Sequence, residues 1–164
     1  MRAASLLLLL ASTFAPACSS PSSAAGSGGS SAAGAGGGAT GVCASDGRAQ
    51  VYTPGMEAAG AMGLFRVRLV SIDPAPAVKG DNAWVVEIVD ACGATVSGAT
   101  VAAKPYMPDH GHGSSIVPTV TELGAGRYQV ASLVLFMPGL WQTTIAITAP
   151  GAADSVVFSF CVAG

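Results

Sequence analysis

Apolar and polar side chains alternate with a period of two along much of the chain beyond residue 50. In Phe65-Arg66-Val67-Arg68-Leu69, both arginines are expected to face water and the three apolar residues to face a core. Trp141, Thr143, Ile145 and Ile147 form a second such face. Because no helical periodicity is sustained in this part of the sequence, the pattern predicts β-strands.

Glycine or proline interrupts the alternating runs about every eight to twelve residues, a spacing typical of a β-sandwich or barrel. Strands are predicted at Leu64–Ile72, Ala83–Val89, Ala99–Tyr106, Val117–Glu122, Arg127–Phe136, Trp141–Thr148 and Ser155–Val162, with a short extra strand at Ala49–Thr53. Gly126-Arg127-Tyr128 is similar to the start of a strand in immunoglobulin-like sandwiches, where a tyrosine closes a corner. We therefore predict an all-β, immunoglobulin-like antiparallel sandwich of about seven strands over residues 43–164.

Strand parity predicts which connections meet. If consecutive strands run antiparallel, Asp73–Asn82, Met107–Ile116 and Met137–Gly139 lie at one end of the sandwich. The remaining connections, Asp90–Gly98, Leu123–Gly126 and Ala149–Asp154, lie at the other end. Met137 is thereby expected beside the loop that begins at Met107.

The first 42 residues do not share this alternation. Arg2, the apolar run Leu6–Ala11 and the small residues Ala15-Pro16-Ala17 follow the order of a secretory signal peptide, predicted for residues 1–17. The run is far shorter than the ~20 residues that span a bilayer. Residues 18–42 are dominated by Ser, Ala and Gly, which predicts a flexible linker.

Two forms of export fit this start. Cleavage before Cys18 and lipidation of its thiol would give a bacterial lipoprotein of the periplasm or outer membrane, with the membrane as partner. Cleavage at Ala15-Pro16-Ala17 would instead release a secreted protein in which Cys18 is an ordinary thiol. Ala15 and Pro16 depart from the usual residues of a lipidation signal, but a tether follows Cys18 at once, and we favour the lipid anchor.

Charge excludes one class of partner. Seven basic residues, of which Arg2 lies in the predicted signal peptide, oppose nine acidic ones. No basic stripe is available, so nucleic acid is not expected as a partner.

Parity also suggests a pairing among the four cysteines. Cys161 ends the last predicted strand at the Met107 end, and Cys43 reaches that end if the extra strand exists. We predict a Cys43–Cys161 disulfide. Cys92 belongs to the opposite end, where it is interpreted as a free thiol, the site of an intermolecular bond or, as the favoured reading, a buried small apolar residue.

Both histidines of the chain lie in one loop, Met107-Pro108-Asp109-His110-Gly111-His112-Gly113. Imidazole nitrogen and thioether sulfur both suit copper, and thioether favours Cu(I). Met107, His110, His112 and Met137 are therefore a candidate metal set for a copper ion, and the protein a candidate copper-binding or copper-handling module.

The same loop has a metal-free interpretation. Histidines flanked by glycine also hydrogen-bond to loop backbone, and the Met-Pro pairs at 107 and 137 also fit as apolar plugs. The alternative function is a metal-free structural or protein- or glycan-interaction module of the cell envelope, with an envelope protein as a candidate partner.

Several segments resemble the YtkA-like domain family, which is similar to FixH-type exported proteins. They are Gly80-Asp81-Asn82-Ala83-Trp84, the loop from Met107 to Gly113, Gly126-Arg127-Tyr128 and Met137-Pro138-Gly139-Leu140-Trp141. The resemblance covers roughly Met56 to Val162. It implies a small exported immunoglobulin-like β-sandwich, often a bacterial lipoprotein, and an association with copper handling or cytochrome oxidase assembly is suggested for relatives. The cysteines lie outside this motif, so their pairing is a separate prediction.

Enzymatic activity is not predicted. Asp109, His112 and Ser114 include the residue types of a hydrolytic triad, but they lie in one short segment. A triad is assembled from separate elements and needs an oxyanion hole, which nothing in this segment supplies.

Overall fold

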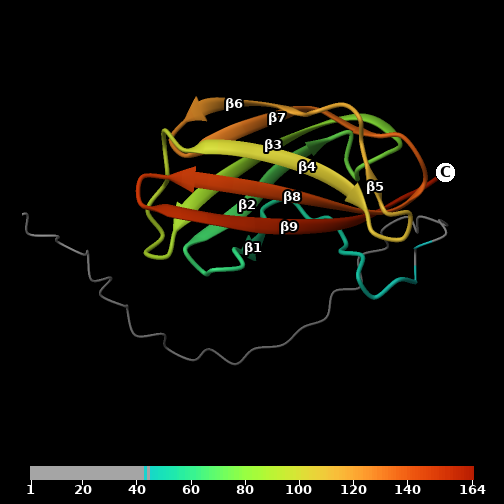
Figure 1. The fold of residues 1–164 in the computed structure, drawn as a ribbon, viewed down its shortest axis with the longest axis horizontal. Helices are drawn as coiled ribbons and strands as arrows, with labels where there is room; N and C mark the ends of the chain where they lie inside the picture. The colour runs from blue at the N-terminus through green and yellow to red at the C-terminus, as the bar shows by residue number, and fades with distance from the viewer. Residues whose placement is uncertain (1–42, 44) are drawn as a thin grey trace, which may run out of the picture.

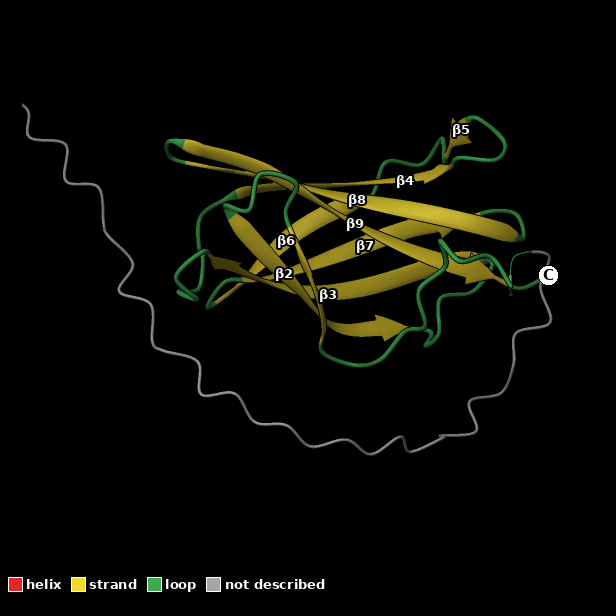
Figure 2. Cartoon of the chain, turned by 90° about the horizontal axis from the view of Figure 1, so that it is seen from below, coloured by secondary structure: helices red, strands yellow, loops and turns green. Residues whose placement is uncertain are grey.

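The alternating runs form strands in the computed structural model, which describes Cys43 and residues 45–164. One antiparallel sheet has the order β1-β2-β3-β7-β6, with β1 Met56–Ala59, β2 Phe65–Asp73, β3 Gly80–Asp90, β7 Arg127–Leu135 and β6 Thr119–Gly124. The other has the order β5-β4-β8-β9, with β5 His112–Gly113, β4 Thr100–Met107, β8 Gly139–Ala149 and β9 Ala152–Val162. Figures 1 and 2 show the two sheets as the layers of a sandwich, which confirms the predicted fold class.

The core lies between the two sheets and is built from the predicted faces. Along β2, the residues Phe65, Val67 and Leu69 are buried while Arg66 and Arg68 are exposed. Trp141, Thr143, Ile145 and Ile147 are all buried on β8. Burying each large apolar side chain stabilises the fold by about 1.5–3 kcal/mol, so these two faces supply much of the driving force for packing the sheets.

The strand pairing confirms the prediction that alternate connections lie at the same end of the sandwich. Gly80 pairs with Leu135 and Gly139 pairs with Val162, which brings the β2–β3 connection, the β7–β8 turn and the end of β9 to one end of the sandwich. Figure 1 shows β5 and the C-terminus at that same end. We call it the histidine end, made of the connections 74–79, 108–111 and 136–138.

Two strand predictions were wrong. The segment Ala49–Thr53 forms no strand. Instead, the Gln50 N–H donates to the Ser159 carbonyl at 2.7 Å, and the Gln50 side-chain oxygen accepts from the Ser159 N–H at 2.8 Å. The Gln50 side chain thus accepts the hydrogen bond that a backbone carbonyl would accept in a strand paired with β9. The sixth strand begins at Thr119 rather than at Val117, because Pro118 has no N–H to donate.

Residues 1–42 lie outside the described residues, so the predicted signal peptide, linker and lipidation of Cys18 stay predictions. Within the described part of the chain, no helix is long and apolar enough to cross a membrane.

The predicted disulfide between Cys43 and Cys161 is present, with the two Cα atoms 5.5 Å apart and 118 residues between them in sequence. It ties the start of the domain to the end of β9 at the histidine end. Closing a loop of this length reduces the entropy of the unfolded chain and stabilises the fold by up to about 5 kcal/mol.

Neither the free-thiol nor the buried interpretation of Cys92 was correct. Cys92 is exposed in the turn after β3, and no free cysteine is present among the described residues. Its exposure has a local cause, since the Asp90 carboxylate accepts hydrogen bonds from the Cys92 and Ala94 N–H groups and holds the turn away from the core.

Tyr128 closes the corner at the opposite end. Its buried hydroxyl donates to the Val96 carbonyl at 2.9 Å and accepts from the Ala99 N–H at 3.1 Å. These bonds hold the β3–β4 connection against β7. The tyrosine of Gly126-Arg127-Tyr128 therefore has the corner role that the sequence predicted.

Asp154 joins the β1–β2 connection to β9 at the same opposite end. Its buried carboxylate accepts hydrogen bonds from the N–H groups of Met62 and Leu64, each at 2.9 Å, and of Ser155 at 2.8 Å. Burial alone would raise the pKa of Asp154, but these backbone donors, with that of Phe65, hold its pKa below the ordinary value of 3.8.

Replacing Tyr128 by Phe is expected to lower the free energy of unfolding by about 1–2 kcal/mol, because the half-buried Val96 carbonyl and Ala99 N–H lose their partner. Urea unfolding measures the change. Tyr106→Phe is the matched control, since Tyr106 is 38% exposed and its hydroxyl has no hydrogen bond among the described residues. Equal effects of the two changes would contradict the corner role.

Asp154→Asn is expected to lower the free energy of unfolding at neutral pH by about 1–3 kcal/mol. Since the folded-state pKa is lowered, the contribution of the carboxylate is complete above the ordinary pKa and is lost as pH falls through the folded value. The gap between natural protein and variant should therefore narrow below about pH 4 in denaturant titrations. A gap that is constant with pH, or an equal gap for the exposed Asp81→Asn, would show that ionisation of Asp154 is not its source.

Candidate metal centre at the histidine end

The histidine loop is a short hairpin between β4 and β5. The His110 and Gly111 N–H groups both donate to the Met107 carbonyl, at 3.2 and 2.9 Å, and Gly111 turns the chain with a φ of 69°. The hairpin pairs Met107 directly with His112. Directly opposed residues of an antiparallel pair lie on the same face, with Cβ atoms about 4.5–5.5 Å apart. The register therefore places the thioether and one imidazole on the same side.

Met107 is fully buried as part of the core. Gly139, the first residue of β8, leaves room for it: a Cβ built on this glycine would lie 2.6 Å from the Met107 methyl carbon. Gly139 also has a φ of 136°, which L side chains rarely adopt. The absence of a side chain at Gly139 thus makes the space that the Met107 methyl group occupies.

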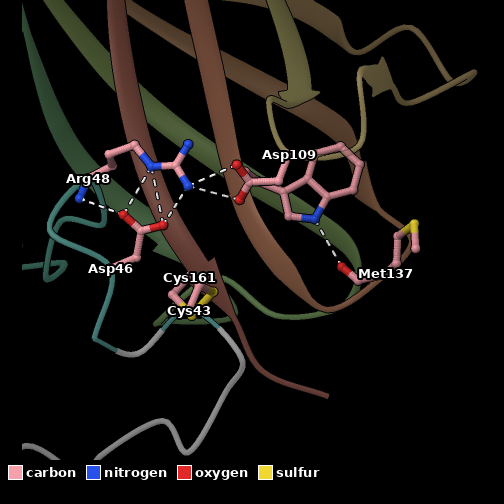
Figure 3. Close-up of a disulfide and its surroundings, with 7 residues drawn as sticks. Cys43, Asp46, Arg48, Asp109, Met137 and Cys161 are labelled. Carbon is pink, nitrogen blue, oxygen red and sulfur yellow. Dashed lines mark hydrogen bonds and ion pairs between the residues drawn. A yellow bond between two sulfur atoms is a disulfide. The ribbon is translucent and has the colours of Figure 1, made fainter.

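His112 is half-buried and stacks on Phe136. Their ring centroids are 5.4 Å apart and the planes differ by 19°. Phe136 in turn meets the edge of Trp141 at 5.4 Å, and the Trp141 indole N–H donates to the Met137 carbonyl at 2.9 Å (Figure 3). This series of contacts fixes the 136–138 turn beside the imidazole and gives the His112 ring one preferred orientation.

The two imidazoles lie close enough to share an ion. His110 is exposed at the tip of the hairpin, and its ring centroid lies 5.7 Å from that of His112, with the planes at 50°. With metal–nitrogen bonds of about 2.0–2.1 Å, two rings on one ion have centroids within about 6 Å. The separation of the two rings is therefore within the range that a shared ion requires.

The donors suit copper better than a hard ion. Two imidazoles and a thioether are soft-leaning ligands, and the buried thioether favours Cu(I). Within the described part of the chain, no three His, Cys, Asp or Glu side chains are grouped as a metal site. Met137 is half-buried and packs against the core. Its inclusion rests on its place in the turn next to Phe136, not on a contact with an imidazole.

Asp109, which precedes His110 in the hairpin, points toward Arg48. The Arg48 Nη2 lies 2.9 Å from both carboxylate oxygens of Asp109, and the same guanidinium donates to Asp46 (Figure 3). Hydrogen bonds from the Arg48 side chain and backbone hold the pKa of Asp46 at about 2. The two carboxylates, the Asp46 side chain first, raise the pKa of Arg48. The network is half-exposed, so solvent screens its charges and its effect on stability is small.

The histidines and methionines of the site were predicted from the sequence, but three of their partners were not. Phe136 was read only as the end of a strand, and Arg48 only as one charge among several. Gly139 was read only as a turn residue. Phe136 could have been found from strand parity, since it immediately precedes Met137 in a connection assigned to this end. Nothing in the sequence linked Arg48 to Asp109, which is 61 residues away.

Comparison with known proteins locates the site within a family domain. The family model described as YtkA-like matches residues 64–146, a span that holds Met107, His110, His112 and Met137. No match was found among curated proteins.

Two similar solved structures are of FetP from uropathogenic Escherichia coli strain F11. One is the protein as isolated, with 14% identity, a TM-score of 0.45 and coverage of 69% of this chain and 96% of that chain. The other is a copper-bound FetP variant, with 14% identity, a TM-score of 0.46 and coverage of 69% and 97%. Neither likeness is close enough to locate a ligand in this chain.

Gly139→Ala is expected to displace the Met107 methyl group and to lower the free energy of unfolding by about 1–3 kcal/mol, the usual effect of overpacking. The Met107 methyl signal in NMR spectra should shift strongly. Gly151→Ala is the control, because Gly151 also has a positive φ, of 78°, but open space where a Cβ would lie. An unchanged Met107 signal in the Gly139 variant would contradict the contact.

Proposed function

Because the chain belongs to the YtkA-like family, we propose that it is an exported binding module that carries copper at the histidine end of its sandwich. One observation carries the proposal: β-pairing puts His112 opposite the buried Met107, and the His110 ring lies 5.7 Å from the His112 ring. Copper is the cargo here, and as Cu(I) it is a soft ion that accepts nitrogen and sulfur ligands.

The proposed ligands differ in exposure, which suggests how an ion enters. His110 is exposed, His112 is half-buried, and Met107 is fully buried. His110 is thus the ligand that meets an incoming ion, His112 holds it with a ring oriented by Phe136, and Met107 supplies the sulfur from below. Met137 is the fourth candidate ligand, from the neighbouring turn.

Export is supported by the disulfide at the same end. Disulfides persist in oxidising compartments such as the periplasm, and Cys43–Cys161 is of this structural kind. The proposal includes a signal peptide over residues 1–17, a linker over residues 18–42 and a lipid anchor at Cys18, which would make the membrane a partner. The linker would let the histidine end reach an envelope protein that gives or takes copper.

Exposed apolar side chains near the loop favour a second candidate function, contact with an envelope protein or glycan without a metal. Tyr106 is 38% exposed, Phe136 43% and Ile116 48%. Tyr106 pairs with Gly113 of the hairpin, and Phe136 stacks on His112. This surface also fits a binding module that passes its ion to a partner, so the two candidates share it. In both, the protein acts by binding rather than as an enzyme.

Anaerobic Cu(I) titration of the mature protein against a chromophoric chelator tests the proposal. A dissociation constant below micromolar is expected for the natural protein, and the His110→Ala, His112→Ala double variant should bind at least about a hundredfold more weakly, or about 2.7 kcal/mol.

Met56→Leu is the control, since Met56 is half-buried on β1 in the other sheet and should leave affinity unchanged. Binding weaker than micromolar in the natural protein, or equal binding in the double variant, would contradict the copper proposal and leave the metal-free function.

A further inference from the structure

One carboxylate next to the proposed ligands in sequence is engaged by an arginine. Asp109 precedes His110 in the hairpin, and both of its oxygens lie 2.9 Å from the Arg48 Nη2. Arg48 comes from the segment that precedes β1, far from the hairpin in sequence. The contact is therefore a tertiary one that turns Asp109 toward the domain's N-terminal segment (Figure 3).

Arg48 is held in place before it meets Asp109. Its Nε donates to the Asp46 carboxylate at 3.0 Å, and its backbone N–H donates to the same carboxylate at 2.9 Å. The Asp46 N–H donates to the Cys43 carbonyl at 3.0 Å, and Cys43 is fixed by its disulfide to Cys161. Little freedom is left in the guanidinium, so a pair with Asp109 loses less conformational entropy than an unrestrained surface pair.

The contact between Arg48 and Asp109 bears on which metal ion the site prefers, because Asp109 carries a carboxylate. Carboxylate oxygen is a hard donor that suits divalent ions, whereas imidazole and thioether leave a site suited to Cu(I). We propose that Arg48 is a specificity-determining residue of the site, which engages Asp109 and so keeps an oxygen donor away from the imidazole pair. This inference rests on the proposed copper function, and it names the residue that sets the preference for Cu(I) over Cu(II).

The proposal predicts opposite behaviour for the two oxidation states. Arg48→Ala frees the Asp109 carboxylate to approach an ion on His110 and His112. Affinity for Cu(II) should then rise about fivefold, a modest change because a half-exposed ion pair holds the carboxylate only weakly. Affinity for Cu(I) should stay within about threefold, since the imidazole and thioether donors are unchanged.

The experiment uses the mature full chain with Cu(I) and Cu(II) titrated separately against competing chelators. The variants are Arg48→Ala, Asp109→Asn and the double variant, in which the gain in Cu(II) affinity should disappear because no carboxylate remains. Arg68→Ala is the matched control, because Arg68 also pairs with two carboxylates, Glu57 and Glu87, on the other sheet. It should change neither affinity.

Electron paramagnetic resonance of bound Cu(II) supplies a readout that a merely structural role would not change. The g-parallel value of Arg48→Ala should rise as an oxygen joins the ligands, and Asp109→Asn should restore it in the double variant. A Cu(II)-to-Cu(I) affinity ratio equal in the natural protein and Arg48→Ala, or an equal loss of both affinities, overturns the role of Arg48 while copper binding stands. Absence of copper binding in the natural protein overturns the proposed function itself.

Discussion

The pairing of Met107 with His112 across the β4–β5 hairpin is the constraint on which the geometry of the candidate site depends. A slip of one residue in this register would turn His112 to the opposite face and separate its imidazole from the thioether. Two close approaches define the register. The Met107 carbonyl accepts from the Gly111 N–H at 2.9 Å, and a Cβ on Gly113 would lie 2.6 Å from the Pro105 carbonyl oxygen. Gly111 and Gly113 thus determine the positions of the two imidazoles in the hairpin.

From this pairing the site extends into the sandwich in one direction and to the surface in the other. Inward, Met107 occupies the space that Gly139 leaves at the start of β8, so the sulfur belongs to the core. Outward, His112 rests on Phe136, and His110 remains exposed. The candidate ligands thus range from a fully buried thioether to an exposed imidazole.

Much of this arrangement could be predicted from sequence because it depends on local periodicity and on parity. Alternation identified the buried faces of β2 and β8, and antiparallel order placed Met137 and Cys161 at the histidine end. The Cys43–Cys161 disulfide was predicted correctly, but through an extra strand that does not form. The failures arose where side chains replace backbone pairing, as Gln50 does beside β9.

Long-range side-chain contacts were also beyond prediction. Residue types alone do not show that Arg48 meets Asp109 or that Phe136 lies under His112. The two-residue strand β5 was missed for a related reason, since a run of two residues has no period to detect. This strand nonetheless determines the site, because its pairing with β4 places His112 opposite Met107.

X-ray absorption of the Cu(I)-loaded protein tests most directly whether Met107 and the histidines share one ion. Two nitrogen scatterers at about 2.0 Å and a sulfur shell at about 2.3 Å are expected. That sulfur shell should lose one scatterer in Met107→Leu, a nearly volume-conserving change that the core tolerates. A shell of nitrogen and oxygen alone in the natural protein, or a sulfur shell unchanged by Met107→Leu, would contradict a copper site shared by Met107 and the histidines.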